Sequence, residues 1–472
     1  MSTFWRTLVL SGLMSKKKQV KLTCSEVKVQ NLSDYLNRQL VEAGQYAQLF
    51  KLVASRRYPG CKIHAMKPGA SGGLRAALSL PKVPAANGLH SAHDALFAAS
   101  MGRYIKACFP EFFSNRFLHE KLHSYLDDAL ESRKMSEFDF FLRGFFLTHA
   151  DRDTGEVIWD AEQEVAQLEH EVCWKNLSQV RDSYSGDQVN SNGFWKMTAY
   201  SPRNPAIANL QIPRKENLPC DVYGGYTSTK FAYFFIYEYE DKRGKRSVAI
   251  AGVPNKLAAD VERDPRLLDA EGMRLSSEAG KKFVKVLFRR VLKKQVFEAY
   301  GEEFFVSGLA ECAPAGQLVF RREDQDRLYT AMRYGTLDPS RLDVEEVLAD
   351  LDWLFGETMS ILARRRPHSY SRLGVERLLT PSEAWHRALE DKPSADRGKL
   401  LTKLCREVSG IVSYFAHNTG AKAMELTLLG GSGIAKVNPG AIAKLIMTPE
   451  AGFAFVNRSA AGLRETRVKA AL

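Results

Sequence analysis

Apolar residues recur with a helical period in the first third of the chain. Between Leu32 and Val53 they return every three to four positions, and Ser33 is placed to cap the amphipathic helix that this spacing predicts. The next stretch, from Gly60 to Gly88, is rich in Gly, Pro and Ala, which predicts loops around one or two short strands. A helix is then expected from Ser91 to Cys108, and helices continue, with breaks, through Leu142.

The pattern changes to short β-prone runs after Asp151. Residues Gly155 to Asp160 predict a hairpin strand. The run from Lys230 to Glu240 is dense in Phe and Tyr, and it is followed by a turn at Asp241 to Lys245, which together predict a β-hairpin. The remaining expected elements are the second hairpin strand Ser247 to Ala251, β runs at Val284 to Val291 and Gln295 to Phe297, an antiparallel pair formed by Phe304 to Leu309 with Gln317 to Phe320, and helices at Asp324 to Arg333 and Val344 to Arg366.

Length and charge narrow the class of protein. A chain of 472 residues exceeds what one hydrophobic core usually supports, so two or three domains are expected. The formal net charge of +12 favours a polyanionic partner such as nucleic acid. The seven cysteines are scattered without a Cys-x-x-Cys pair, which argues against a zinc ribbon and indicates a reducing, cytoplasmic setting. The apolar stretch Thr7 to Met14 is too short to span a bilayer, so no membrane partner is expected.

Three motifs have a plainer explanation beside a functional one. His119-Glu-Lys-Leu-His123 has the histidine spacing of a zinc protease, but Lys121 adds an unsuitable charge, and an ordinary surface helix is favoured. Leu429 to Gly433 lacks the ending of a phosphate-binding loop and predicts a flexible turn. The basic run from Lys281 to Lys294 fits a solvated strand face and a stripe that contacts phosphates equally well.

A fourth motif carries more chemistry. His90-Ser91-Ala92-His93-Asp94 combines two imidazoles and a carboxylate at the start of a predicted helix. The carboxylate of Asp94 can bind a divalent metal, and an adjacent imidazole can position or deprotonate a water for phosphodiester hydrolysis. Helix capping and packing explain the same residues without any catalysis.

This His-rich motif resembles the third RuvC-like segment of the RNA-guided DNA endonucleases of type II CRISPR systems, whose pattern is His-His-Ala-x-Asp-Ala. Further segments resemble the same family in the same order along the chain: Phe4-Trp5-Arg6, Arg38 to Glu42, Thr154 to Asp160, Tyr223 to Tyr226 with Ser228, Ala232 and Tyr233, and Gly462 to Arg467. The resemblance therefore extends over nearly the whole chain.

The resemblance implies an α/β fold followed by an α+β fold. A partial RNase H-like (RuvC-like) domain would precede a mixed, β-rich wedge and a domain that reads the short DNA motif called the PAM. The implied divisions are an inter-nuclease linker remnant at 1–20, the third RuvC-like segment at 21–190, the wedge and phosphate-lock region with the start of the PAM-interacting domain at 191–295, and the remainder of that domain at 296–472.

The resemblance also assigns residues. Lys196 and Thr198 fall in a loop that resembles the one holding a target-strand phosphate, and Lys436 falls where relatives read a PAM base with an Arg. Asp94 would bind Mg2+ or Mn2+, whereas Ser91 stands where the family has a catalytic His. A Ser is no base at neutral pH, so His90 or His93 would have to replace that His.

The resemblance implies a fragment of an endonuclease of CRISPR antiviral defence that does not cut DNA alone. In the family, the carboxylates of the other two RuvC-like segments and the HNH nuclease domain lie upstream, and one Asp cannot hold two metal ions. The implied partners are guide RNA (crRNA with tracrRNA), target double-stranded DNA and the missing N-terminal half. The alternative is a non-catalytic nucleic-acid-binding module, or a subunit that completes a nuclease in trans.

Overall fold

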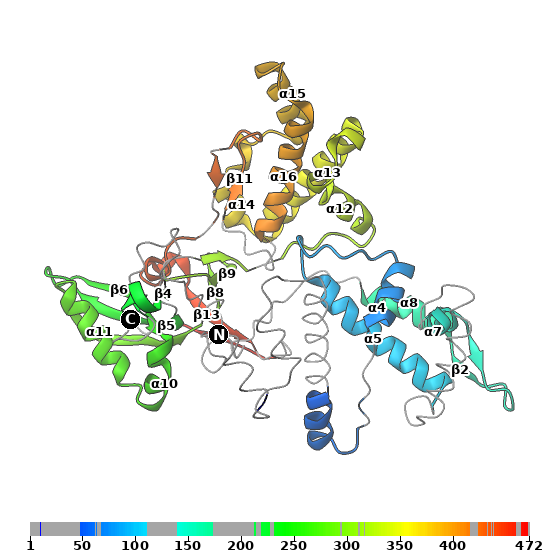
Figure 1. Ribbon diagram of the computed structural model, residues 1–472, viewed down its shortest axis with the longest axis horizontal. Coiled ribbons are helices and arrows are strands. Elements are labelled where there is room, and N and C mark those ends of the chain that lie inside the picture. The colour runs from blue at the N-terminus through cyan, green and yellow to red at the C-terminus, as the bar shows by residue number, and fades with distance from the viewer. Residues whose placement is uncertain are drawn as a thin grey trace. The chain divides into compact units, whose positions relative to one another are not determined.

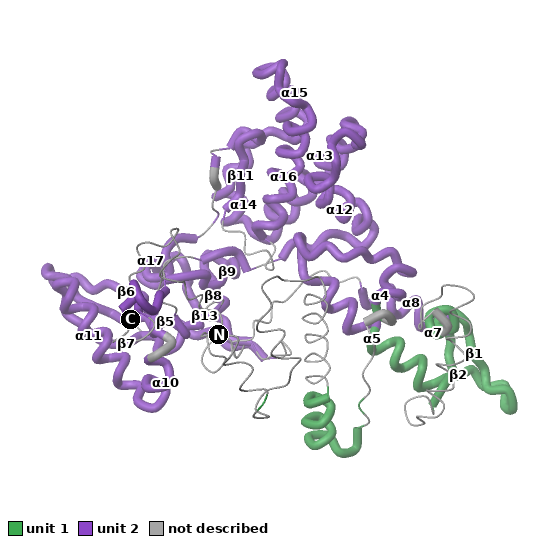
Figure 2. Tube along the Cα trace, viewed as in Figure 1, with its two compact units in different colours: residues 1–71, 98–160 green, residues 72–97, 161–472 purple. Residues whose placement is uncertain are grey.

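The structure is a computed structural model. In it the chain folds into two compact units (Figure 2). Unit 1 comprises residues 1–71 and 98–160, and unit 2 comprises residues 72–97 and 161–472. The structure describes residues 10, 48–61, 63, 68–110, 139–172, 212–213, 219–226, 231–292, 295–309, 312–315, 317–415, 423–431, 433–435, 437, 439–458 and 464–470.

In unit 1 an aromatic core surrounds the C-terminal part of helix α5 (Leu89–Cys108). The ring of Tyr104 lies 5.1 Å from that of Trp159, and the Trp159 indole N–H donates to the Phe145 carbonyl at 2.9 Å. Trp159 ends the strand of the predicted hairpin, which is confirmed. The other described elements of this unit are a helix at residues 48–57, α7 (Asp139–Phe145), β1 (His149–Ala150) and β2 (Val157–Trp159), which pairs antiparallel with β1.

The stretch between Gly60 and Gly88 contains a helix, α4 (Pro68–Ala77), so its prediction as loops and short strands is wrong in this part. Three glycines in its first turns disfavour a helix intrinsically. The side chains of Leu74 and Leu78, one helical turn apart, are 0% and 5% exposed. Burial of this apolar face stabilises the turn in spite of the poor local propensity.

The first sheet of unit 2 has three antiparallel strands in the order β6-β5-β7. Central strand β5 (Phe231–Glu240) forms the predicted hairpin with β6 (Arg246–Pro254), and β7 (Lys282–Val291) lies on its other side. Helix α11 (Leu267–Glu278) packs along β7 (Figure 1). The strand prediction is confirmed for all three segments.

The second sheet has five antiparallel strands and joins distant parts of the sequence. The predicted pairing of Phe304–Leu309 with Gln317–Phe320 is wrong, because β9 instead pairs with β8 and β10. Leu318 and Phe320 are buried against helices and form no strand. The strands follow the order β10 (Cys312–Pro314), β9 (Glu302–Val306), β8 (Val296–Ala299), β13 (Ala454–Arg458) and β14 (Glu465–Val468).

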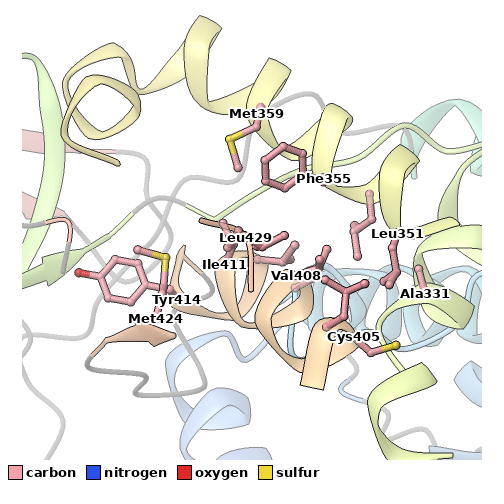
Figure 3. Packing of buried hydrophobic residues seen from close by; sticks show 14 of the residues in the cluster. Ala331, Leu351, Phe355, Met359, Cys405, Val408, Ile411, Tyr414, Met424 and Leu429 are labelled. Carbon is pink, nitrogen blue, oxygen red and sulfur yellow. The ribbon is translucent and has the colours of Figure 1, made fainter. Parts of the chain in front are cut away.

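Helices between residues 325 and 415 pack around the largest apolar cluster (Figure 3). The predicted helix at Val344 is confirmed as α13 (Val344–Arg365), and the Asp343 carboxylate caps it by accepting from the N–H of Glu345 at 2.9 Å. Leu351 and Phe355 of α13 face Val408 and Ile411 of α16 (Arg397–Phe415). The accompanying helices are α12 (Gln325–Ala331), α14 (Pro367–Leu373) and α15 (Pro381–Asp391).

A buried polar cluster ties these helices to the five-stranded sheet. The carboxylate of Glu302, which is 4% exposed, accepts from the backbone N–H groups of His368 at 2.7 Å and Ser369 at 3.0 Å. The Arg366 guanidinium lies 3.8 Å from Glu302 and donates to the Glu303 carbonyl at 2.9 Å. The Glu302 carboxylate therefore accepts hydrogen bonds from the free N–H groups at the start of α14 and also balances the charge of the buried Arg366.

The remaining described elements are short: α8 (Ala161–Glu171), β3 (Ile212–Pro213), α9 (Cys220–Tyr223), β4 (Gly225–Tyr226), α10 (Asn255–Arg263), β11 (Met424–Glu425), β12 (Ile434–Ala435) and α17 (Ile442–Ile446). Both parts of the chain thus mix helices with strands, as expected, and every described strand pair is antiparallel. The RNase H-like arrangement stays a prediction. None of the helices whose residues are described is long and apolar enough to cross a membrane.

Candidate functional site

Backbone and amide hydrogen bonds fix the start of α5, which carries the candidate motif. The Asn87 side-chain oxygen accepts from the Leu89 N–H at 3.1 Å, and its amide donates to the Leu318 carbonyl at 3.0 Å. The helix begins two residues earlier than the pattern predicted. Asn87 therefore anchors the helix start, and the motif occupies the first helical turns.

Two cations neutralise Asp94, the candidate metal ligand. Its carboxylate forms an ion pair with Arg75 of α4 and lies 3.1 Å from the Lys82 ammonium. The Arg75 side chain is 11% exposed and that of Asp94 is 31% exposed, so both are shielded from full hydration. The sequence does not predict these two ion pairs. Arg75 and Lys82 reach the carboxylate only because the loop between α4 and α5 folds back toward the start of α5.

His93 is a buried, neutral histidine. It is 3% exposed, its ring stacks on Phe97 with centroids 5.9 Å apart, and it hydrogen-bonds to the Val172 backbone. Burial, together with the nearby charges of Arg75 and Arg322, lowers its pKa to about 4 in spite of the opposing hydrogen bond to Val172. At neutral pH the His93 ring is therefore uncharged.

The other two motif residues differ in environment. Burial and the Lys82 charge lower the pKa of His90, so this ring is also neutral at physiological pH. Ser91, by contrast, is exposed on the helix surface. The structure thus places all four predicted residues on one helix start, with His93 turned into the interior.

The described residues around Asp94 do not fit a site for Mg2+ or Mn2+. Such ions take several oxygen ligands, usually carboxylates and waters. Asp94 is a single carboxylate, and the charges of Arg75 and Lys82 would repel a metal ion. In the ranges that the structure describes, no three His, Cys, Asp or Glu side chains gather where they could hold one.

A pocket of about 370 Å³ adjoins His93, and the sequence analysis did not identify it. Four arginines line it together with two glutamates, and the Arg322 guanidinium donates to the Ser79 carbonyl at 3.4 Å. Two Arg-Arg pairs far apart in sequence supply this charge, and only the fold brings them together. The charged lining residues are Arg321, Arg322, Arg364, Arg365, Glu323 and Glu357.

Other predicted residues lie outside the described part of the chain. These are Lys196, Thr198 and Lys436, and the histidine pair His119 and His123. Their roles stay predictions.

Comparison with known families finds two domain matches along the chain. The Cas9 RuvC domain matches residues 47–183, and the PAM-interacting domain of CRISPR-associated endonuclease Cas9 matches residues 192–356. The first match contains the His90 to Asp94 motif, and the second contains the three-stranded sheet. A RuvC domain match is therefore followed by a match to a PAM-interacting domain.

The chain belongs to the Cas9 family, and the matched domains are the C-terminal ones implied by the resemblance. It is 24% identical over 261 residues to the CRISPR-associated endonuclease Cas9 of Listeria innocua serovar 6a, covering 51% of this chain and 19% of that protein. It is 23% identical over 304 residues to that of Streptococcus mutans serotype c, covering 58% of this chain and 22% of that protein. The chain thus spans about a fifth of these curated relatives.

Proposed function

We propose that this chain is the part of an RNA-guided DNA endonuclease of CRISPR antiviral defence that binds guide RNA and PAM-containing duplex DNA. The observation that carries the proposal is the order of the two matches, a RuvC domain and then a PAM-interacting domain. The formal charge of +12 supports a polyanionic partner. In this role Lys196 and Thr198 hold a DNA phosphate, and Lys436 contacts the PAM.

We further propose that the chain does not cleave DNA by itself. Phosphodiester hydrolysis by a RuvC-type site needs converging carboxylates that hold divalent ions. The ion pairs of Asp94 with Arg75 and Lys82 support an inactive arrangement, since they occupy the one carboxylate that the motif offers. A bound Mg2+ or Mn2+ would require further carboxylates and displacement of these cations.

Binding of labelled nucleic acid to the purified chain tests the first proposal. Fluorescence anisotropy with guide RNA, and with duplexes that carry a randomised PAM position, should show binding that weakens as salt rises. A chain that binds neither RNA nor DNA at low salt would contradict it.

The Asp94 ion pairs also favour a second candidate, a non-catalytic nucleic-acid-binding module or a subunit that completes a nuclease in trans. A chain that carries the other RuvC-like segments and the HNH domain would then supply the missing carboxylates. Adding such a chain to this one should restore metal-dependent cleavage if the two assemble. Unchanged inactivity would favour a module that only binds.

A further inference from the structure

The basic run from Lys281 to Lys294 separates into two environments in the structure. In its later half, Arg289 lies 3.4 Å from the Asp269 carboxylate of α11. Arg290 lies 3.5 Å from Glu262 of α10, and its guanidinium covers the Tyr233 ring at 5.5 Å. These two cations are therefore paired with carboxylates of the protein itself, which fits the interpretation of this part of the run as a solvated strand face.

The first half of the run lies beside the turn between β5 and β6. Strand pairing places Lys282 opposite Glu240, the last residue of β5 before that turn. Gly280 precedes β7 with a φ of +66°, and a Cβ atom there would lie 3.4 Å from the Cε atom of Lys242. The Lys242 stem thus lies against the turn between α11 and β7, and the two turns are neighbours.

Cations from both turns gather at this end of the sheet, and we call them the basic tip. All are exposed, and the carboxylates within residues 238–246 and 281–285 are Glu238, Glu240 and Asp241. Cations therefore outnumber carboxylates by about two to one. The basic tip comprises Lys242, Arg243, Lys245, Arg246, Lys281, Lys282 and Lys285.

Two of the three carboxylates already have partners within the protein. Glu238 is 2% exposed and lies 3.5 Å from Arg246 and 3.8 Å from Lys285. The Asp241 carboxylate accepts from the backbone N–H groups of Arg243 at 2.8 Å and Lys245 at 3.0 Å, so it shapes the turn. Among the described residues, no ion pair is formed by Lys242, Arg243, Lys245 or Lys282.

Local contacts fix the backbone of the β5–β6 turn and the position of one ammonium group in the basic tip. Asp241 closes the turn through its two backbone hydrogen bonds, and Gly244 adopts a φ of 76° that the turn requires. The Lys281 ammonium is positioned 3.9 Å above the Tyr239 ring. A fixed turn backbone loses less conformational entropy on binding than a flexible loop would.

The composition of the basic tip favours phosphates over a protein partner. Five of its seven cations are lysines. Lysine is depleted in the cores of protein–protein interfaces, whereas it is a common donor to the phosphates of nucleic acid. The matched PAM-interacting domain spans this segment, which points to DNA.

We propose that the basic tip binds the phosphate backbone of duplex DNA independently of base sequence. The proposal rests on the proposed function, in which the chain binds PAM-containing duplex DNA. The basic tip adds a contact beyond the predicted residues Lys196, Thr198 and Lys436. It raises affinity for duplexes of every sequence and leaves PAM preference to other residues.

Charge-matched variants of the full chain test this. The tip variant replaces Lys242, Lys245, Lys281 and Lys282 by Gln. The control variant replaces Arg263, Arg266, Arg289 and Arg290 by Gln, which removes the same charge from cations that are paired with carboxylates on α10, α11 and the preceding loop. Circular dichroism and unfolding transitions verify that both variants fold like the wild type.

Anisotropy with labelled duplex DNA at several salt concentrations is the readout. Each phosphate contact contributes about 0.9 to the slope of log K against log salt, so the four substitutions of the tip variant should reduce the slope by about 3.6 and the affinity by about tenfold or more. The control variant should keep the wild-type slope and lose less than about twofold, and both should keep the PAM preference.

The possible failures are distinguishable. A wild-type chain that does not bind DNA contradicts the proposed function and, with it, the role of the basic tip. A wild-type chain that binds DNA while the tip variant binds equally well contradicts the basic tip alone. Equal losses of duplex binding in both variants contradict the assignment of the DNA contact to the basic tip.

Discussion

The buried ring of His93 makes stability depend on pH in a defined direction. Its pKa in the folded protein is about 4, compared with 6.5 for a free histidine. The unfolded chain therefore binds the proton more tightly than the folded one. The stability contributed by the neutral ring is present above pH 6.5 and is lost as the pH falls toward 4. At 1.36 kcal/mol for each pKa unit, the loss is about 3 kcal/mol.

Replacing His93 by Gln removes this titration while it keeps an N–H donor for the Val172 backbone. Urea unfolding followed by circular dichroism would be compared for wild type and variant between neutral pH and about pH 4.5. The wild type should lose about 2–3 kcal/mol more than the variant over this range. His90 is present in both proteins, so its titration contributes equally to the two curves.

A matched control is His386→Gln, because His386 is exposed on α15. Its stability should follow that of the wild type at every pH. Parallel curves for the wild type and His93→Gln would refute the assignment of His93 as a buried neutral histidine.

Two further predictions concern buried or shielded charge. Glu302→Gln should lower the free energy of unfolding by about 3–5 kcal/mol, because it leaves Arg366 charged and unpaired in the interior. The control Glu298→Gln should lower the free energy of unfolding by less than about 1 kcal/mol, since its partner at 3.1 Å is the exposed Arg467. Equal losses for the two variants in urea unfolding would contradict the role of Glu302. At Asp94, millimolar Mg2+ should leave the unfolding temperature unchanged, because Arg75 and Lys82 already neutralise the carboxylate. An Mg2+-dependent rise in the wild type that is absent from Asp94→Asn would show that a metal binds there.

Local patterns predicted the elements whose own residues determine them. The aromatic run of β5 with the Asp241 turn defined a hairpin, and the capped periodic helix α13 was placed to within one residue. The strand predicted around Leu318 is absent from the described part of the structure. Its apolar residues are β-prone, but they are buried against helices that are distant in sequence. In α4, likewise, burial of Leu74 overrode the helix-breaking glycines.

The sequence also located the helix start that carries His90 to Asp94, but not the charges around it. Arg75 and Lys82 lie 19 and 12 residues before Asp94, and neither spacing corresponds to a helix or strand repeat. Their approach depends on the loop between α4 and α5, which is held by Asn87 and Leu318. A resemblance in sequence therefore identified the motif, whereas the structure identified the cations that occupy it.

We propose above all that this chain binds DNA without cutting it. The most direct test incubates the purified chain with guide RNA, a PAM-library duplex and Mg2+ or Mn2+, and measures complex formation and strand cleavage on the same sample. We expect a retained DNA complex with both strands intact. Metal-dependent cleavage by this chain alone, or the absence of any complex, would contradict it.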